Sequence, residues 1–162
     1  MHKEEISFEY EVYESVQELN TADAALLQEA RAITINAYAP YSHFLVGAVA
    51  RLKNGATVTG TNQENAAYPV GICAERVLMS VAAVLHPNEP IDTIAISYNN
   101  TKGSSDVPVS PCGMCRQALQ EFEQRTASPI RLILSGATGA IFVISRSTLL
   151  LPFSFGRDDM NR

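Results

Sequence analysis

The sequence lacks several patterns, and each absence narrows the possible functions. No apolar stretch approaches the roughly 18 residues that a membrane-spanning helix needs, so no membrane association is expected. Residues 1–5 lack the apolar core and the small-residue cleavage site of a secretory signal, so a cytoplasmic protein is expected. The 162 residues contain no internal repeat or low-complexity segment, and a single domain over residues 1–162 suits this length.

Positive charge is also scarce. The chain has 12 Lys and Arg against 17 Asp and Glu, which gives a formal net charge of −5. An acidic surface repels phosphate backbones, so a nucleic acid polymer is not expected as a partner and a small neutral substrate is favoured. Hydrophobic residues make up 46% of the chain, which argues against disorder and indicates a buried core.

Cysteine occurs only three times, in two short clusters. Cys73 stands two residues before Glu75, while Cys112 and Cys115 have the C-x-x-C spacing that can hold one metal ion. An odd number of clustered cysteines indicates metal binding in a reducing compartment rather than disulfides. Three thiolates with one open position are typical of a catalytic zinc, since structural sites usually close with four protein ligands.

Charged residues next to these cysteines suit catalysis at such a metal. Both cysteine clusters are expected at helix N-termini, where the partial positive charge favours thiolates. Glu75 is the candidate for moving protons to and from a zinc-bound water. Arg76 is a better candidate than Arg116 for balancing the excess thiolate charge, because it directly follows the glutamate. The alternatives are a helix-capping glutamate, a structural zinc module and buried inert thiols.

Hydrophobic periodicity predicts a single sheet covered by helices. Residues 1–20 form an N-terminal extension whose alternating pattern over 6–12 indicates an edge strand. Asn54-Gly55 indicates a hairpin, and the turn at 136–139 is too short for a parallel crossover, so the last two strands should be antiparallel. Further strands are expected over residues 45–53, 56–61, 91–98, 130–135 and 140–145. Helices are expected over residues 21–37, 74–85 and 113–125.

Four segments carry a specific resemblance to a known family. They are residues 38–48 (YAPYSHFLVGA), 60–68 (GTNQENAAY), 72–76 (ICAER) and 110–117 (SPCGMCRQ), and the tail at 150–155 also fits. The chain resembles the small, three-cysteine cytidine deaminases that act on free nucleosides, a class whose zinc chemistry is well described. The resemblance implies a three-layer α/β/α sandwich around a mixed five-stranded sheet. It also implies hydrolytic deamination of cytidine and deoxycytidine to uridine and deoxyuridine in pyrimidine salvage.

The resemblance also implies roles for individual residues. Cys73, Cys112 and Cys115 would hold one Zn²⁺ per subunit, with Glu75 as the proton shuttle and Arg76 as the charge-balancing group. Substrate binding would fall to Asn62 and Glu64 at the ribose, Phe44 against the nucleoside, Ala74 at the pyrimidine edge and Phe155. Because the aromatic of the tail would stack in a neighbouring subunit, a homotetramer with sites at subunit interfaces is implied. Leu45 replaces the usual proline, and the strand at 6–12 is additional.

Three other functions compete with this interpretation. A deaminase for another aminonucleoside is disfavoured by Asn62 and Glu64, which suit an unmodified ribose. A polynucleotide editor is disfavoured by the acidic charge and by the antiparallel final strands. A structural zinc module would require four protein ligands and no exchangeable water.

Overall fold

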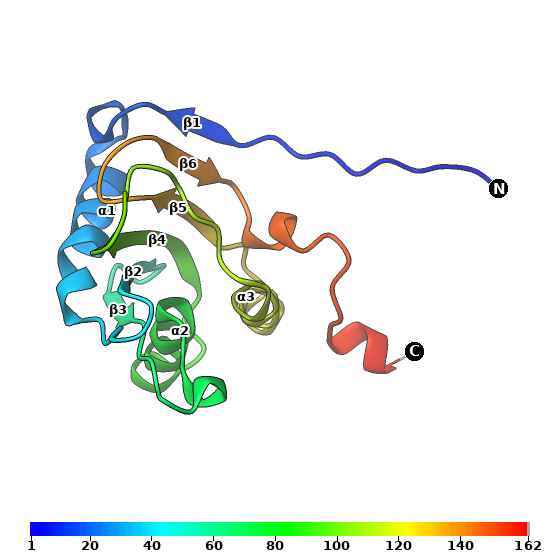
Figure 1. The fold of residues 1–162 in the computed structure, drawn as a ribbon. Helices are drawn as coiled ribbons and strands as arrows, with labels where there is room; N and C mark the ends of the chain where they lie inside the picture. The colour runs from blue at the N-terminus through cyan, green and yellow to red at the C-terminus, as the bar shows by residue number, and fades with distance from the viewer. Residues whose placement is uncertain (162) are drawn as a thin grey trace.

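The computed structural model describes residues 1–161, and its centre is one mixed sheet (Figure 1). The spatial order of the strands is β1-β6-β5-β4-β2-β3. The strands are β1 (Glu11–Tyr13), β2 (Phe44–Leu52), β3 (Thr57–Thr61), β4 (Ile91–Asn100), β5 (Arg131–Ser135) and β6 (Ile141–Ile144). The helices are α1 (Thr21–Ile33), α2 (Ala74–Leu85) and α3 (Gly113–Thr126).

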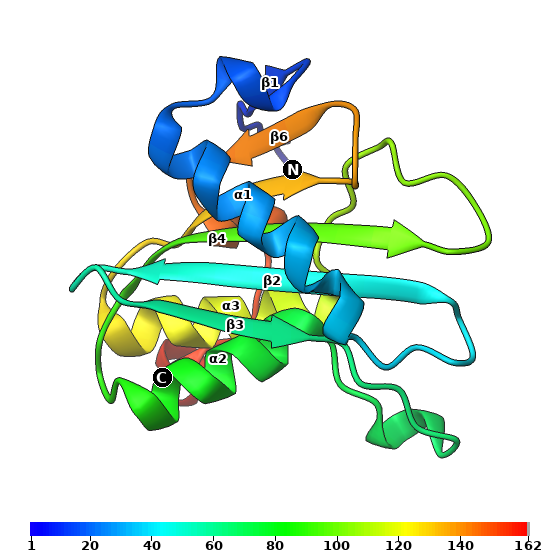
Figure 2. The same cartoon turned by 90° about the vertical axis from the view of Figure 1, so that its left-hand side faces the viewer.

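The helices cover both faces of the sheet. Helix α1 lies on one face, and α2 and α3 lie side by side on the other (Figures 1 and 2). The predicted three-layer α/β/α sandwich is therefore confirmed. The predicted count of five strands was one too low, because β1 pairs antiparallel with β6 and becomes a sixth strand at the edge.

Strand directions follow from the lengths of the connections. β4 and β5 are parallel, and α3 lies in the long crossover between them, as a parallel connection requires. Every other neighbouring pair is antiparallel, including β5 and β6 as predicted. The parallel pair places the start of α3 beyond the carboxyl end of β4, at one end of the sheet.

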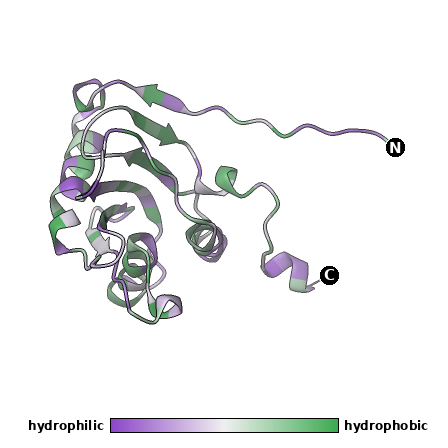
Figure 3. Ribbon diagram, in the orientation of Figure 1, coloured by the Kyte–Doolittle hydropathy of each residue, from purple (hydrophilic) through white to green (hydrophobic). Residues whose placement is uncertain are grey.

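A hydrophobic core fills the space on each side of the sheet. The strands facing the two cores are mostly hydrophobic along their length (Figure 3). The larger core lies beneath α2 and α3 and includes Leu78, Ile94 and Leu119, all without solvent exposure. The smaller core lies beneath α1 and includes Leu27 and Ile133. Because α2 and α3 are anchored on the same core, their N-terminal ends are held in fixed relative positions.

The N-terminal segment differs from the predicted strand over residues 6–12. Only Glu11–Tyr13 pair with β6, and the preceding residues extend away from the body of the protein (Figure 1). β6 contains only four residues, so its backbone offers few hydrogen-bonding partners to a neighbouring strand. Tyr10 packs edge-on against Phe142 of β6, with ring centroids 5.0 Å apart, where the extended segment leaves the sheet.

The predicted helix boundaries were right for α2 and close for α3, which extends one residue further to Thr126. The first helix ends earlier than the predicted residue 37, because Thr34–Asn36 form a 3₁₀ turn after Ile33. The Thr34 hydroxyl donates to the Arg31 carbonyl at 2.8 Å, a local bond typical of helix ends. Among residues 1–161, no helix has both the length and the apolar character needed to cross a membrane.

Candidate active site

Two helix N-termini bring the three cysteines together. Cys73 is the N-cap residue of α2 and Cys112 is the N-cap residue of α3, both with extended backbone. Cys115 lies one turn into α3 and is buried, whereas Cys73 is half-buried and Cys112 is exposed. The unpaired backbone amides and the positive end of both helix dipoles are therefore directed at one cluster of sulfur atoms.

The sulfur atoms have the spacing of a single metal site. Cys73 Sγ lies 3.8 Å from Cys112 Sγ, which lies 3.6 Å from Cys115 Sγ. All three lie within 4.8 Å of one another. Two thiolates bound at about 2.3 Å to one tetrahedral zinc would be separated by about 3.8 Å, so the cluster fits this ion.

Close packing between β3 and α2 fixes the position of Cys73. A Cβ atom on Gly60 of β3 would lie 2.4 Å from the carbonyl oxygen of Ala74 and 2.5 Å from the amide nitrogen of Leu78. Only glycine allows the first turn of α2 to lie this close to the strand. The chain entering the helix is fixed by paired backbone hydrogen bonds between Gln63 and Ile72, at 2.9 and 3.0 Å.

The thiols polarise one another. A hydrogen bond with Cys115 is the main cause that lowers the pKa of Cys73 to about 6. Burial and the charge of Glu75 act to raise this pKa, whereas Cys112 and Arg76 lower it by smaller amounts. The same bond to Cys73, together with burial, raises the pKa of Cys115. Cys73 is thus more readily a thiolate than Cys115. The Arg76 charge acts in the direction expected of a charge-balancing residue.

Glu75 is a buried carboxyl group next to the sulfur cluster. It belongs to the first turn of α2 and is only 5% exposed. Burial raises the pKa of Glu75 above the ordinary value. Hydrogen bonds from its own backbone and from Cys115 act to lower this pKa but are outweighed by burial. A raised pKa is the direction of shift that suits a carboxyl group to giving and taking protons as a shuttle.

Glu75, Cys73 and Cys112 line one cavity of about 540 Å³. Its other walls are formed by Ser42, Phe44, Val46, Asn62, Ala74, Ile96, Val109 and Ser110. The predicted substrate-binding residues Phe44, Asn62 and Ala74 are therefore brought together with the cysteines. Phe44 stacks on the buried ring of Tyr98, with centroids 4.4 Å apart and planes 12° apart, so its orientation is fixed from behind.

Asn62 has a structural role that the sequence did not reveal. Its Oδ1 accepts from the backbone amide of Val46 at 2.7 Å, and its Nδ2 donates to the carbonyl of Phe44 at 2.9 Å. These bonds hold the side chain against the backbone at the start of β2, where Phe44 and Val46 form part of the cavity wall. A primary amide has a second donor hydrogen and a second acceptor lone pair, so Asn62 retains capacity for a ligand.

Glu64 lines a second cavity rather than the one lined by Cys73 and Cys112. The second cavity, of about 380 Å³, is lined by Tyr41, Ser42, Glu64, Asn65, Tyr68 and Gly71. The Glu64 Oε2 atom accepts from the backbone amides of Tyr41 at 2.9 Å and Ser42 at 3.3 Å. Burial acts to raise the pKa of Glu64, but these bonds and the Ser42 side chain outweigh it and lower the pKa. Glu64 therefore presents a negative charge in the second cavity, which shares Ser42 with the first.

Comparison with known proteins agrees with this arrangement. Residues 20–128 match the family described as the cytidine and deoxycytidylate deaminase zinc-binding region. A cytidine deaminase from Halalkalibacterium halodurans is 36% identical over 136 residues, which cover 84% of this chain and 96% of the relative. The chain belongs to the cytidine and deoxycytidylate deaminase family. Zinc is the cofactor of this family's matched region, and the three-cysteine cluster fits one ion per chain.

Structural comparison gives the same assignment for the fold. The crystal structure of a cytidine deaminase from Burkholderia pseudomallei superposes with a TM-score of 0.70 at 34% sequence identity. The alignment covers 81% of this deaminase-family chain and 97% of the Burkholderia chain. A second relative, from Mycobacterium tuberculosis, is 36% identical over 129 residues, covering 78% of this chain and 84% of the relative. The family match begins at residue 20, after β1.

Some predicted site residues lie away from the cavities. Phe155 is 63% exposed on the C-terminal segment and does not line either cavity described for residues 1–161. Arg76 is half-buried and faces a groove between α2 and α3. His43 is half-buried in left-handed backbone with φ of 59°. Tyr98 was missed, because a stacking partner behind Phe44 depends on strand pairing rather than on a local motif.

Proposed function

We propose that this chain catalyses the hydrolytic deamination of cytidine and deoxycytidine to uridine and deoxyuridine, with release of ammonia. The observation that carries the proposal is a cluster of three cysteine sulfurs beside a cavity that Cys73, Cys112 and the buried Glu75 line. The sulfurs have the spacing of a zinc site with three protein ligands, and the cavity gives a substrate direct access to it. The relatives named as cytidine deaminases support the same activity.

The side chains of the cavity provide the remaining chemistry. Bound zinc would supply a water of lowered pKa as the nucleophile. Glu75 would accept a proton from that water and deliver it to the ring nitrogen of the pyrimidine. It would then take the remaining proton from the hydroxyl added at C4 and pass it to the amine, so that the C4 carbonyl forms as ammonia leaves. Because Glu75 is buried beside the cysteines, it can act without competition from bulk water. Arg76 would offset the negative charge of three thiolates.

Phe44, Asn62, Glu64 and Ala74 would bind the nucleoside. The spare donor and acceptor of Asn62 and the carboxylate of Glu64 would hydrogen-bond the ribose hydroxyls. Phe44 would contact the nucleoside with a ring held by Tyr98. The backbone at Ala74, which starts α2 directly after Cys73, would face the pyrimidine edge.

The charges around the cavities favour a nucleoside over a nucleotide. The family includes deaminases of cytidine and of deoxycytidylate, which carries a phosphate. Among residues 1–161, the lining of the two cavities includes Glu64 and Glu75 but no Lys or Arg. A phosphate entering either cavity would meet a carboxylate without a cation to pair with.

We further propose a homotetramer with active sites at subunit interfaces, in which Phe155 stacks on the ligand of a neighbouring subunit. The exposure of Phe153, at 86%, and of Phe155 supports a partner subunit over the tail. Light scattering of the purified protein tests this assembly, and a monomer with full activity would contradict it. The three free thiols suit a reducing compartment, so a cytoplasmic location is proposed.

A direct assay tests the proposed reaction. Purified protein loaded with zinc is incubated with cytidine, deoxycytidine, deoxycytidylate and a non-pyrimidine aminonucleoside, and ammonia release and ultraviolet absorbance are measured. Cytidine and deoxycytidine should react much faster than the other two. Glu75→Gln should retain zinc and fold while its rate falls by about 10²–10⁴. Glu121→Ala, an exposed change on α3, is the control and should keep the wild-type rate. Wild-type activity in Glu75→Gln would remove Glu75 from the mechanism.

A further inference from the structure

The C-terminal tail, residues 151–161, is attached along α3 by hydrogen bonds to two glutamines. Gln117 Nε2 donates to the carbonyl of Phe155 at 2.7 Å, and the amide of Arg157 donates to Gln124 Oε1 at 3.3 Å. Gly156 lies between these contacts and is buried. A Cβ atom there would lie 2.8 Å from Gln124 Nε2 and 3.0 Å from Gln120 Nε2, so the tail backbone sits directly on the helix.

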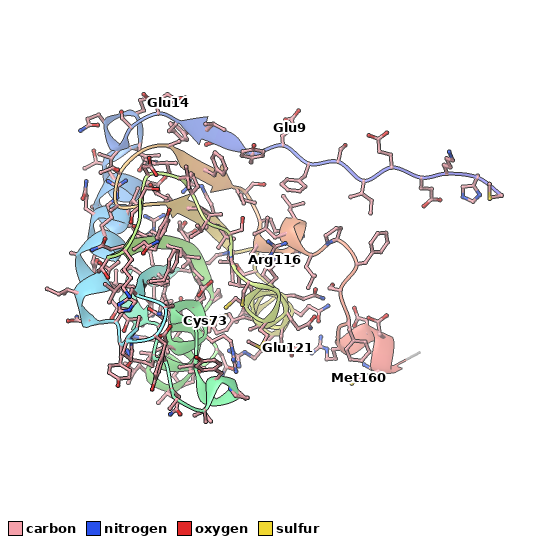
Figure 4. All side chains as sticks on the ribbon, in the orientation of Figure 1. Glu9, Glu14, Cys73, Arg116, Glu121 and Met160 are labelled. Carbon is pink, nitrogen blue, oxygen red and sulfur yellow. The ribbon has the colours of Figure 1, made fainter. Side chains whose placement is uncertain are left out.

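Arg116 joins the start of the tail to the segment that enters the cysteine cluster. Its Nε donates to the carbonyl of Pro111 at 2.8 Å, and its NH1 donates to the carbonyl of Leu150 at 3.0 Å. Pro111 immediately precedes Cys112, and Leu150 immediately precedes the tail. Figure 4 shows Arg116 on the side of α3 that faces the segment leading into the tail. The planar guanidinium thus bridges two backbone segments that are distant in sequence.

We propose that Arg116 and Gln117 are positioning residues that fix the tail relative to the metal-binding loop. Both directly follow Cys115 on α3. A displacement of this first turn would therefore move the sulfur ligand, the Pro111 carbonyl and the tail together. Arg116 acts through geometry, because it donates hydrogen bonds to two neutral carbonyls, whereas Arg76 acts through its charge on Cys73.

The part of the proposal that concerns substrate rests on the proposed function, in which Phe155 contacts the nucleoside. Gln117 holds the carbonyl of Phe155 itself, so its loss should release the aromatic ring without disturbing the sulfurs. Arg116 holds both Pro111 and Leu150, so its loss should affect the metal site and the tail. The two residues are therefore expected to give different kinetic signatures.

Tail attachment can be measured without an enzyme assay. The chain contains no tryptophan, so Phe153→Trp introduces a single fluorophore on the tail at a highly exposed position. Adding Gln117→Ala should lower the fluorescence anisotropy of this tryptophan and increase its quenching by acrylamide. Adding Glu29→Ala instead, at an exposed position of α1 on the other face of the sheet, should leave both unchanged. Equal anisotropy and quenching in all three proteins would overturn the role of Gln117.

Zinc release tests the role of Arg116. A colorimetric chelator is added to zinc-loaded protein, and the release rate is compared for wild type, Arg116→Lys and Arg116→Ala. A lysine keeps the positive charge but lacks the fork that spans both carbonyls. Both variants should therefore release zinc faster than wild type. A wild-type release rate in Arg116→Lys would show that charge alone is needed and would overturn the bridging role.

Steady-state kinetics separate this proposal from the proposed function. Gln117→Ala should raise KM for cytidine by about fivefold at nearly unchanged kcat and zinc content, as expected for loss of one ordinary hydrogen bond. An unchanged KM in an active enzyme would contradict the tail's role while leaving the deaminase assignment intact. If wild-type protein deaminates no pyrimidine nucleoside, the proposed function fails, whereas fluorescence and zinc release still decide the positioning roles.

Discussion

The sulfur atoms of Cys73 and Cys112 lie 3.8 Å apart, although the residues are separated by 39 positions in the chain. Each residue is the N-cap of a helix, and both helices lie on the same face of the sheet. Neither cysteine caps its helix through a side-chain hydrogen bond, so both sulfurs remain available to a metal. The fold thus brings two helix N-termini together, and their partial positive charges favour thiolates at this site.

Removal of a cysteine ligand should remove both zinc and stability. Cys115→Ser is expected to reduce zinc below one ion per chain, because serine is a poor ligand for this ion. Zinc present at about 1,000 times its dissociation constant stabilises a folded protein by about 4 kcal/mol, so the melting temperature should also fall. Metal analysis and thermal unfolding measure the two effects. Met114→Ala, at an exposed position between the ligands, should change neither, and a full complement of zinc in Cys115→Ser would refute the ligand assignment.

Local sequence signals predicted the elements that carry the cysteines. The apolar stripe of α2 and Pro87 beyond its end gave both boundaries of that helix correctly. The short turn between β5 and β6 gave their antiparallel direction. These features depend on periodicity and chain length, which a sequence contains directly.

Other features depend on partners that a sequence does not identify. The alternation over residues 6–12 indicated an extended segment, but the length of β6 limits the strand to three residues. Asn62 was expected only as a ribose ligand, whereas it also bonds the edge of β2. That bond joins positions 16 residues apart and becomes visible only when the β2–β3 register is known.

Replacing Gly60 should displace the start of α2. In Gly60→Ala the new methyl group would meet backbone atoms of Ala74 and Leu78, which cannot rotate away. Overpacking of this kind costs about 1–3 kcal/mol, and we expect a loss in this range together with weaker zinc binding. Gly113→Ala is the matched control, because nothing lies within 4 Å of its Cβ position.

The control variant, Gly113→Ala, is itself expected to have a small effect on stability. Gly113 is the first residue of α3, and alanine suits a helix better than glycine, so stability should stay constant or rise slightly. Urea unfolding and zinc titration of both variants provide the measurement. Wild-type stability in Gly60→Ala would mean that α2 can move away from β3 at little cost.

Asn62 should contribute to stability as well as to substrate binding. Asn62→Ala leaves the amide of Val46 and the carbonyl of Phe44 without their partner, which should cost about 1–3 kcal/mol. Asn62→Asp retains an acceptor for Val46 but loses the donor to Phe44, so its loss should be partial. Both variants should raise KM for cytidine. Gln63→Ala, at the neighbouring exposed position, should leave the free energy of unfolding within about 0.5 kcal/mol of wild type. A stable Asn62→Ala with a raised KM would restrict the residue to a ligand role.

Glu123 should be the most sensitive charged position outside the site, because its buried carboxylate joins three segments. Oε1 accepts from the amide of Ile130 at 3.1 Å and from the hydroxyl of Ser147 at 2.6 Å, while Oε2 pairs with Arg146 at 2.8 Å. Its side chain is 1% exposed, whereas that of Arg146 is 56% exposed.

The difference in exposure between the Glu123 and Arg146 side chains predicts which replacement lowers stability more. Glu123→Ala leaves the buried amide of Ile130 and the hydroxyl of Ser147 without their acceptor, and each stranded donor should lower the free energy of unfolding by about 1–3 kcal/mol. Arg146→Ala should cost far less, because a largely exposed partner contributes about 0–1 kcal/mol. Urea unfolding of the two variants, with Glu121→Ala as the exposed carboxylate control, gives the comparison. Equal losses in Glu123→Ala and Arg146→Ala would mean that the ion pair, rather than the bonds to Ile130 and Ser147, holds the end of α3 to the sheet.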